Sequence, residues 1–229
     1  MSQNLLKRIS TSVILLSLLF FINFSHQYIF ILSILIVGLI ICVEANNIFS
    51  KLTVNQNLKK KLTIKKFNFR FLLLNLVTFC YIFFIFCTFS YEIHRLEGPT
   101  FFLYVVSICI FTDIGGYVFG KIIGGKKLSN ISPNKTISGT IGSFIFSVMP
   151  LFFFLSFSYL DLELNLNFIL FSLLISFISQ IGDLFISFFK RKAGIKDTGK
   201  ILPGHGGILD RVDGIIFAVP FSYILLKII

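Results

Sequence analysis

Seven apolar stretches, separated by loops that hold nearly all of the basic residues, dominate this sequence. They lie at 9–24, 28–45, 71–90, 100–120, 140–159, 167–189 and 212–229. A helix that crosses the hydrocarbon core of a bilayer needs about 20 apolar residues, within a range of roughly 17–25. The first stretch is the shortest and falls just below that range. The pattern predicts an all-α integral membrane protein, a polytopic bundle of about seven transmembrane helices.

The composition supports the same class. Hydrophobic residues make up 55% of the 229-residue chain, 31 residues are Phe, and only 14% are charged. Soluble domains carry roughly 25% charged residues. A soluble protein of this size has too little interior to hide so much apolar surface, so lipid is the expected solvent for most of it.

The loop charges predict which side of the membrane each loop faces. If the N-terminus is cytoplasmic and the stretches alternate, 19 of the 21 Lys and Arg residues fall in cytoplasmic loops. The positive-inside rule predicts this separation. In a soluble protein the net charge of +11 would suggest nucleic-acid binding. Between apolar segments it favours anionic lipid headgroups or an anionic substrate instead, and no nucleic-acid partner is predicted.

Two carboxylates, Asp113 and Asp183, lie inside predicted spans near their cytoplasmic ends. An ionisable side chain costs at least about 2.5–3.5 kcal/mol there, so it normally faces a partner or a wet cavity. Asp113 shares a helix face with Tyr117, and a polar stripe that begins at Ser172 includes Asp183. We expect both faces to point into the bundle. For the serines of the stripe, plain interhelical hydrogen bonding remains an equal explanation.

The loop that follows Asp183 concentrates basic residues, glycines and carboxylates. Lys and Arg neutralise phosphates, and glycines let backbone N–H groups approach an anion. Asp210 and Asp213 are expected to share one helix face at the start of the last span. An Asp at a helix start is ordinarily a cap, but with Asp183 the set suits Mg²⁺, which binds carboxylates together with substrate phosphates.

From Ser187 to Asp213 the chain reads S-x-x-K-R-x4-K-D-x-G-x2-L-P-x-H-G-G-x2-D-R-x-D, which resembles the signature of phosphatidate cytidylyltransferases (CDP-diacylglycerol synthases) at every fixed position. A second stretch is similar to the same family, at Asp113, Tyr117, Gly120, Ser132, Pro133, Asn134, Lys135, Thr136 and Gly139. Two positions depart from the common family pattern: Ser138 stands where many members have an acidic or amide residue, and Ile186 where many have Glu. The resemblance covers roughly 110–229; before that, only general hydrophobicity supports it.

The resemblance implies that CTP and phosphatidate react to give CDP-diacylglycerol and pyrophosphate, with Mg²⁺ as cofactor and a second metal ion left open. It implies Asp183 and Asp210 as metal ligands supported by Asp213. The implied catalytic set adds two phosphate-binding residues, Lys190 and Arg191. The implied substrate-binding residues are Lys196, Asp197, His205, Gly206, Gly207 and Arg211 in this loop, with Asp113, Ser132, Lys135 and Thr136 from the earlier stretch.

The predicted organisation is an N-terminal group of about three transmembrane helices with a basic loop (1–99), then a catalytic transmembrane domain (100–229). The active site is expected at the cytoplasmic face of a bacterial inner membrane. The expected partners are CTP, phosphatidate and membrane lipids, with a homodimer left open. Glu44, at the end of the second stretch, is interpreted as simply reaching the membrane interface.

Two other functions stay open at this point. One is a kinase that uses CTP to phosphorylate a polyprenol-like alcohol, because such enzymes share related sequence features. The other is an ion-coupled transporter in which Asp113 and Asp183 relay cations. The dense basic and glycine-rich loop favours the cytidylyltransferase over both.

Overall fold

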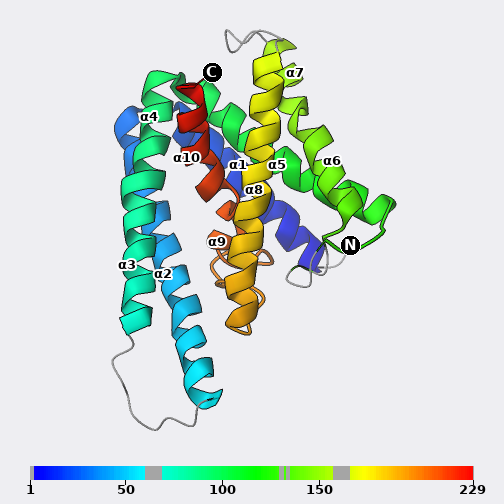
Figure 1. The fold of residues 1–229 in the computed structure, drawn as a ribbon. Helices are drawn as coiled ribbons and strands as arrows, with labels where there is room; N and C mark the ends of the chain where they lie inside the picture. The colour runs from blue at the N-terminus through cyan, green and yellow to red at the C-terminus, as the bar shows by residue number, and fades with distance from the viewer. Residues whose placement is uncertain (1–2, 60–68, 129–131, 133–134, 157–165, 229) are drawn as a thin grey trace. The chain divides into compact units, whose positions relative to one another are not determined.

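The computed structural model describes residues 3–59, 69–128, 132, 135–156 and 166–228, and for 3–7 and 54–59 it describes the backbone only (Figure 1). Across these residues the regular structure is helical, and no strand is formed. Pro133 and Asn134 of the predicted second stretch lie outside the described residues. The predicted all-α class is confirmed.

Five helical segments in the described part of the chain are long and apolar enough to cross a membrane: Gln27–Thr53, Phe69–Leu96, Gly98–Ile122, Ile137–Ser156 and Leu166–Lys192. Each coincides with one of the predicted stretches. Shorter apolar helices occupy the other two stretches, at Arg8–Phe24 and Ile215–Leu226. As far as the stretches are described, helices therefore occupy all seven, and five of these helical segments have the full spanning length.

The chain folds into two compact units. The first unit joins Met1–Thr88 to Phe189–Val212. Its elements are α1 (Gln3–Phe24), α2 (Gln27–Lys59), α3 (Phe69–Cys80), a π-helical segment (Tyr81–Cys87) and the one-turn α9 (Leu209–Val212). α2 and α3 lie side by side, and α2 also contacts α9 (Figure 1). The signature loop therefore folds with helices from the start of the chain.

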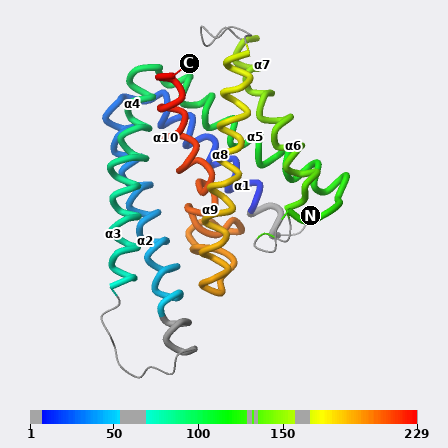
Figure 2. The backbone as a smooth tube through the Cα atoms, viewed as in Figure 1, coloured from blue at the N-terminus to red at the C-terminus, as the bar shows by residue number. Residues whose placement is uncertain are grey.

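The second unit joins Phe89–Phe188 to Asp213–Ile229. Its elements are α4 (Thr88–Leu96), α5 (Gly98–Ile122), α6 (Ile137–Ser147), α7 (Met149–Ser156), most of α8 (Leu166–Lys192) and α10 (Ile215–Leu226). α5 and α6 pack closely against each other (Figure 2). A side chain at Gly115 would overlap the backbone of Gly142, so small residues permit this close approach.

The polar stripe on α8 points into its unit, as predicted. Ser172 and Ser176 are fully buried. Ser172 Oγ lies 2.8 Å from Tyr104 Oη, and Thr112 Oγ1 donates to Ser176 Oγ at 2.9 Å. These bonds join α8 to α5, so interhelical hydrogen bonding explains this part of the stripe.

The prediction that the Asp113 face of α5 points into the bundle holds for its glycines and is wrong for its polar side chains. Asp113 is exposed, and so is Tyr117, at 67%. The glycines of the same face pack closely against the α6 segment instead. A side chain at Gly116 would collide with Ser143, and one at Gly120 would press on Thr136.

The seventh predicted stretch also begins differently from the prediction. α9 ends at Val212 and α10 begins at Ile215, so Asp210 and Asp213 do not share a face of one continuous helix. Gly214 lies at this break, and glycine is a poor helix former. Its N–H donates to Asp213 Oδ1 at 3.0 Å, and its Cα packs so closely on Ser179 that a side chain there would collide with it.

Candidate active site

A buried ion pair between α8 and α9 anchors the signature loop. Lys190 Nζ donates to Asp210 Oδ1 at 2.8 Å, and the two side chains are only 9% and 7% exposed. Lys190 lies in the last turn of α8, where the helix dipole favours a positive charge. A buried ion pair is stable only if further hydrogen bonds satisfy its remaining polar atoms.

The other carboxylate oxygen of Asp210, Oδ2, accepts further hydrogen bonds from the signature loop. Oδ2 accepts from the backbone N–H of Thr198 at 2.7 Å and from the N–H of Gly207 at 3.0 Å. It also lies 3.0 Å from the Thr198 hydroxyl oxygen, whose single hydrogen it shares with Glu44. Burial by itself raises the pKa of the Asp210 carboxyl. The bonds from Lys190, Gly207 and Thr198 outweigh burial, so the pKa lies below its ordinary value. Asp210 is therefore a carboxylate at neutral pH and ties both ends of the loop together.

Glu44, on α2, is a second carboxylate buried against this loop. It is only 2% exposed. Its Oε1 accepts from the N–H of Ile208 at 3.1 Å, and its Oε2 accepts from the N–H of Leu209 at 2.9 Å and from the Thr198 hydroxyl at 2.7 Å. The interpretation that Glu44 reaches the membrane interface is wrong, because its partners are two backbone N–H groups and a hydroxyl of the signature loop.

One sequence signal could have identified Glu44. It directly follows an apolar run, and the nearest basic residue along the helix is Lys51, two turns away. A carboxylate placed there without a local cation needs donors from another part of the chain. Backbone N–H groups at the start of a short helix are such donors, but their position is not visible in the sequence.

The Leu202–Gly207 turn is narrow. Leu202 and Gly206 form an isolated antiparallel bridge, with N–O distances of 2.9 and 3.1 Å. Gly206 has a φ of +88°, a conformation that side-chain-bearing residues rarely adopt. A side chain at Gly207 would overlap both Thr198 and Glu44. The glycines of the signature thus serve two needs, a left-handed turn and the close approach of a carboxylate.

A polar pocket of about 590 Å³ opens beside this turn. We call it the loop pocket; its walls come from Arg8, Lys196, Asp197, Gly199, Lys200, Leu202, Pro203, Gly204, His205, Gly206 and Arg211. Four of these residues are exposed cations: Arg8, Lys196, Lys200 and Arg211. Clustered Lys and Arg side chains bind phosphates through charge-assisted hydrogen bonds. The loop pocket therefore suits a polyphosphate.

His205 is the titratable residue of this pocket nearest to neutral pH. Burial lowers the pKa of its imidazole below the ordinary value, and the positive charges of Arg211 and Arg8 lower it further. The ring is therefore neutral at pH 7. Arg211 also donates to the His205 carbonyl at 2.8 Å, which fixes the backbone of the turn.

The second unit holds a second lysine–carboxylate pair. Lys135 Nζ contacts Asp183 Oδ2, and the two side chains are 29% and 22% exposed. Ser187 Oγ donates to the other oxygen of Asp183 at 3.2 Å. Two stretches far apart in the sequence, the one with Lys135 and the one with Asp183, are thus joined by this contact.

The neighbours of Lys135 shape the start of α6. Thr136 caps the helix by accepting from the N–H of Gly139 at 3.1 Å. Lys135 N–H donates to the Ser132 carbonyl at 3.1 Å. Ser138 contacts Thr136 Oγ1 at 3.0 Å and donates to the Gly124 carbonyl. Ser138, which departs from the common family pattern, therefore joins the start of α6 to the backbone at Gly124.

The remaining predicted site residues are divided between the units. In the first unit, Arg191 is exposed and donates to the Ile195 carbonyl at 3.4 Å. In the second, Asp213 is 8% exposed. Each unit holds one of the two predicted metal ligands, Asp210 and Asp183. Their convergence on one ion stays a prediction.

The donor chemistry is compatible with Mg²⁺ held partly by substrate. No group of three His, Cys, Asp or Glu side chains within the described ranges is arranged to hold a metal ion. Such a trio is not required, because Mg²⁺ in nucleotide-using enzymes is commonly bound by one or two carboxylates plus phosphates and water. Asp183 is the more accessible of the two predicted ligands.

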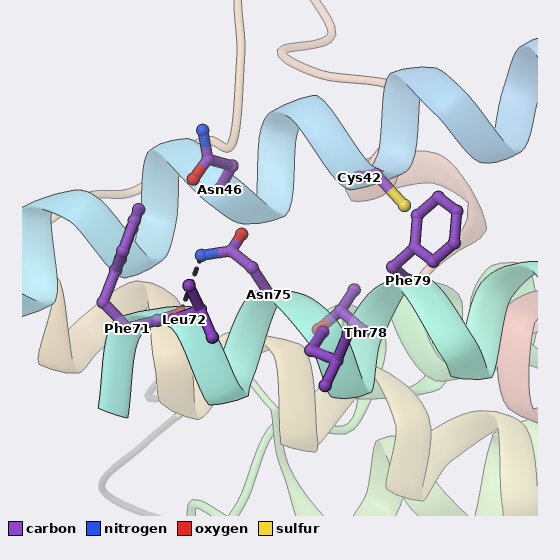
Figure 3. Close-up of a pocket in the computed structure, with 8 residues that line it drawn as sticks. Cys42, Asn46, Phe71, Leu72, Asn75, Thr78 and Phe79 are labelled. Carbon is purple, nitrogen blue, oxygen red and sulfur yellow. Dashed lines mark hydrogen bonds between the residues drawn. The ribbon is translucent and has the colours of Figure 1, made fainter. Parts of the chain in front are cut away.

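Another cavity, of about 530 Å³, lies between α2 and α3 (Figure 3). Apolar side chains dominate its wall, including Phe71 and Phe79, and its polar residues are neutral. The Asn75 amide there donates to the Phe71 carbonyl at 2.8 Å. Because this cavity offers no cation for a phosphate, the loop pocket is the better candidate for the anionic substrate.

The sequence also matches known proteins. The family model described as the cytidylyltransferase family matches residues 46–229. The chain is 46% identical over 134 residues to the phosphatidate cytidylyltransferase of Staphylococcus haemolyticus (strain JCSC1435). It is 47% identical over 140 residues to that of Staphylococcus aureus (strain COL).

These matches cover 58% and 60% of this chain and 51% and 53% of the two relatives. The chain thus spans about half the length of the curated relatives it matches. The relatives are bacterial, and with the five apolar helices they fit a multi-pass protein of the inner membrane. Glu44 and all of α1 lie before the residues that the family model matches.

Proposed function

Because the chain belongs to the cytidylyltransferase family, we propose that it transfers the cytidylyl group of CTP to phosphatidate, giving CDP-diacylglycerol and pyrophosphate for phospholipid biosynthesis. The observation that carries the proposal is the loop pocket, with its four cations beside the turn that Asp210 and Glu44 hold in shape. The names of the two staphylococcal relatives support the choice of phosphatidate as the acceptor.

The reaction joins two anions. A phosphate oxygen of phosphatidate attacks the α-phosphorus of CTP, and the bond from that phosphorus to the bridging oxygen breaks to release pyrophosphate. The attacking oxygen is already charged near neutral pH, so no strong general base is needed. The principal task of the site is to neutralise and orient phosphates. Lys196, Lys200 and Arg211 line the loop pocket and would bind the phosphates there.

The carboxylates have a different part in the proposal. Asp183 and Asp210 are the metal ligands that we propose, with Asp213 in support, and bound Mg²⁺ would supply Lewis-acid polarisation and charge neutralisation of the phosphates. Lys135 and Lys190 contact the two carboxylates and would hold them in position before substrate binds.

The proposal also includes the membrane arrangement. Seven spans and a cytoplasmic N-terminus put nearly all basic residues on the cytoplasmic side, as the positive-inside rule requires. The active site then lies at the cytoplasmic face, with the diacyl tails of phosphatidate in the adjoining lipid. Residues 1–99 form the N-terminal helices and residues 100–229 the larger catalytic part. Membrane lipids surround the bundle, and a homodimer is compatible with this arrangement.

Product analysis tests the proposed reaction. The detergent-purified chain is incubated with phosphatidate, Mg²⁺ and CTP labelled at either the α- or the γ-phosphate. Cytidylyl transfer places the α-label on lipid and the γ-label in pyrophosphate. A γ-label on lipid would instead identify a CTP-dependent kinase. If wild type converts no phosphatidate and releases no pyrophosphate, the proposal is wrong.

A further inference from the structure

We propose that α1 forms one wall of the nucleotide site, where Arg8 binds the triphosphate and Thr11 and Ser12 hold His205 in place. The inference rests on the proposed function of the loop pocket. It adds a helix that lies outside the residues matched by the family model. The ligand class is a nucleoside triphosphate, recognised here through its phosphate chain.

The contact between α1 and His205 involves both ring nitrogens. Thr11 Oγ1 lies 2.5 Å from His205 Nδ1, and Ser12 Oγ lies 3.3 Å from Nε2. A neutral imidazole has one donor and one acceptor nitrogen, and a hydroxyl can match either. The two hydroxyls therefore set the orientation of the ring. With both nitrogens engaged, His205 acts as a positioning residue that shapes the pocket and is not placed to carry a proton.

Arg8 connects the same helix to the turn. Its Nε donates to the Gly204 carbonyl at 3.2 Å, and the residue is exposed in the wall of the loop pocket. A guanidinium has five N–H donors arranged in a plane. One bond to the loop therefore leaves other N–H donors of Arg8 for a ligand. Arginine often binds phosphate through two parallel N–H···O bonds.

The charges in the pocket match a triphosphate. Arg8, Lys196, Lys200 and Arg211 line the pocket together with one carboxylate, Asp197. The pocket volume of about 590 Å³ lies in the usual range for small-molecule sites, roughly 300–1,000 Å³. Without Arg8, the cations of the pocket would all come from the signature loop. With it, the phosphate chain is held from two sides, by α1 and by the loop.

The first experiment changes Arg8 alone. In detergent-purified protein, Arg8→Gln should raise the KM for CTP about tenfold, which is the loss of one charge-assisted contact of about 1.4 kcal/mol. The kcat and the KM for phosphatidate should stay within twofold. Arg70→Gln is the matched control, because Arg70 is an exposed arginine of the same unit that does not line the pocket. An unchanged KM for CTP in Arg8→Gln would overturn the inference.

The second experiment tests the hold on His205. The double variant Thr11→Val/Ser12→Ala removes both hydroxyls and should also weaken CTP binding, whereas Thr11→Ser should retain it. A melting temperature close to wild type shows that the fold is intact. If the double variant keeps the wild-type KM for CTP, the positioning role of α1 is wrong.

Equilibrium binding of labelled CTP separates this inference from the proposed reaction. If wild type binds CTP and Arg8→Gln binds about tenfold more weakly, the inference stands whatever the acceptor substrate is. Equal binding by the two proteins would overturn the inference alone. If wild type binds no CTP, the inference falls together with the proposed function.

Discussion

The two lysine–carboxylate pairs have the same chemistry and different surroundings. Lys190 and Asp210 are almost fully buried, and Asp210 also accepts bonds from Thr198 and Gly207. Lys135 and Asp183 are about a quarter exposed. The comparison suggests a division of labour: the buried pair maintains the shape of the signature loop, and the accessible pair can exchange partners with a bound ligand.

The energetics of ion pairs support this division. Removing one partner of a buried pair leaves an uncompensated charge in a poorly solvated place, which is strongly destabilising. An accessible pair contributes much less to stability, because water already screens both charges. Substitutions should therefore lower stability more at Lys190–Asp210 than at Lys135–Asp183, although both pairs hold a carboxylate that we propose as a metal ligand.

The largest expected effect is on stability. Lys190→Met should lower the free energy of unfolding by about 3–5 kcal/mol, because the Asp210 carboxylate would stay buried without its cation. Thermal unfolding in detergent measures the change, with Lys135→Met as the matched control. The control should lose no more than about 1 kcal/mol. Equal losses in the two variants would contradict the proposed division.

The next effect is on catalysis. Asp183→Asn should lower kcat/KM by about 100- to 1,000-fold, or about 2.7–4 kcal/mol, and should raise the Mg²⁺ concentration needed for half-maximal rate. Its melting temperature should stay near that of wild type, since Asp183 is partly solvated. Glu92→Gln, which changes a carboxylate paired with Arg95, is the control. Near wild-type activity of Asp183→Asn at limiting Mg²⁺ would remove Asp183 from the metal site.

A smaller effect is expected at Glu44. Glu44→Gln keeps the size of the side chain but replaces one acceptor oxygen with a donor, which then faces a backbone N–H. We expect a loss of about 1–3 kcal/mol at this buried site. Hydrogen exchange at Ile208 and Leu209 should speed up, while exchange in α5 should not. Unchanged protection of both amides would show that Glu44 does not hold the loop.

The smallest effect is a pH dependence. The pKa of Asp210 is lower in the folded protein than its ordinary value of 3.8. Its stabilising contribution is therefore complete above that value and is lost as the pH falls through the folded pKa. Asp210→Asn should flatten this acidic part of the melting-temperature profile. A variant profile parallel to that of wild type would show that other groups cause the acid sensitivity.

Much of the fold could be predicted because apolar runs and loop charge are local properties of the sequence. In the described residues each of the seven stretches is mainly helical, and the α8 stripe from Ser172 faces its unit. The start of the last stretch was predicted wrongly, because hydropathy does not reveal the helix break at Gly214. The Asp113 face was expected to point into the bundle, yet Asp113 is exposed and the glycines of that face make the contact with α6.

The candidate site could be predicted only in part. The signature located Lys190, Asp210 and the glycine turn, because these residues are close in sequence. It could not locate the partners that the N-terminal helices supply. Thr11 is 194 positions from His205, and Glu44 is 164 positions from Ile208. Contacts over such separations depend on tertiary packing, which hydrophobic pattern and charge do not determine.

The crowding at Gly207 has a consequence for how this family can diverge. Any side chain at this position would occupy the space of the Glu44 carboxylate. A glycine is thus needed at position 207 because Glu44, on α2, takes up the space that a side chain would fill. A lineage that shortened Glu44 would relax the constraint at position 207, and one that kept Glu44 could accept no larger residue there. The two positions should therefore be inherited as a pair.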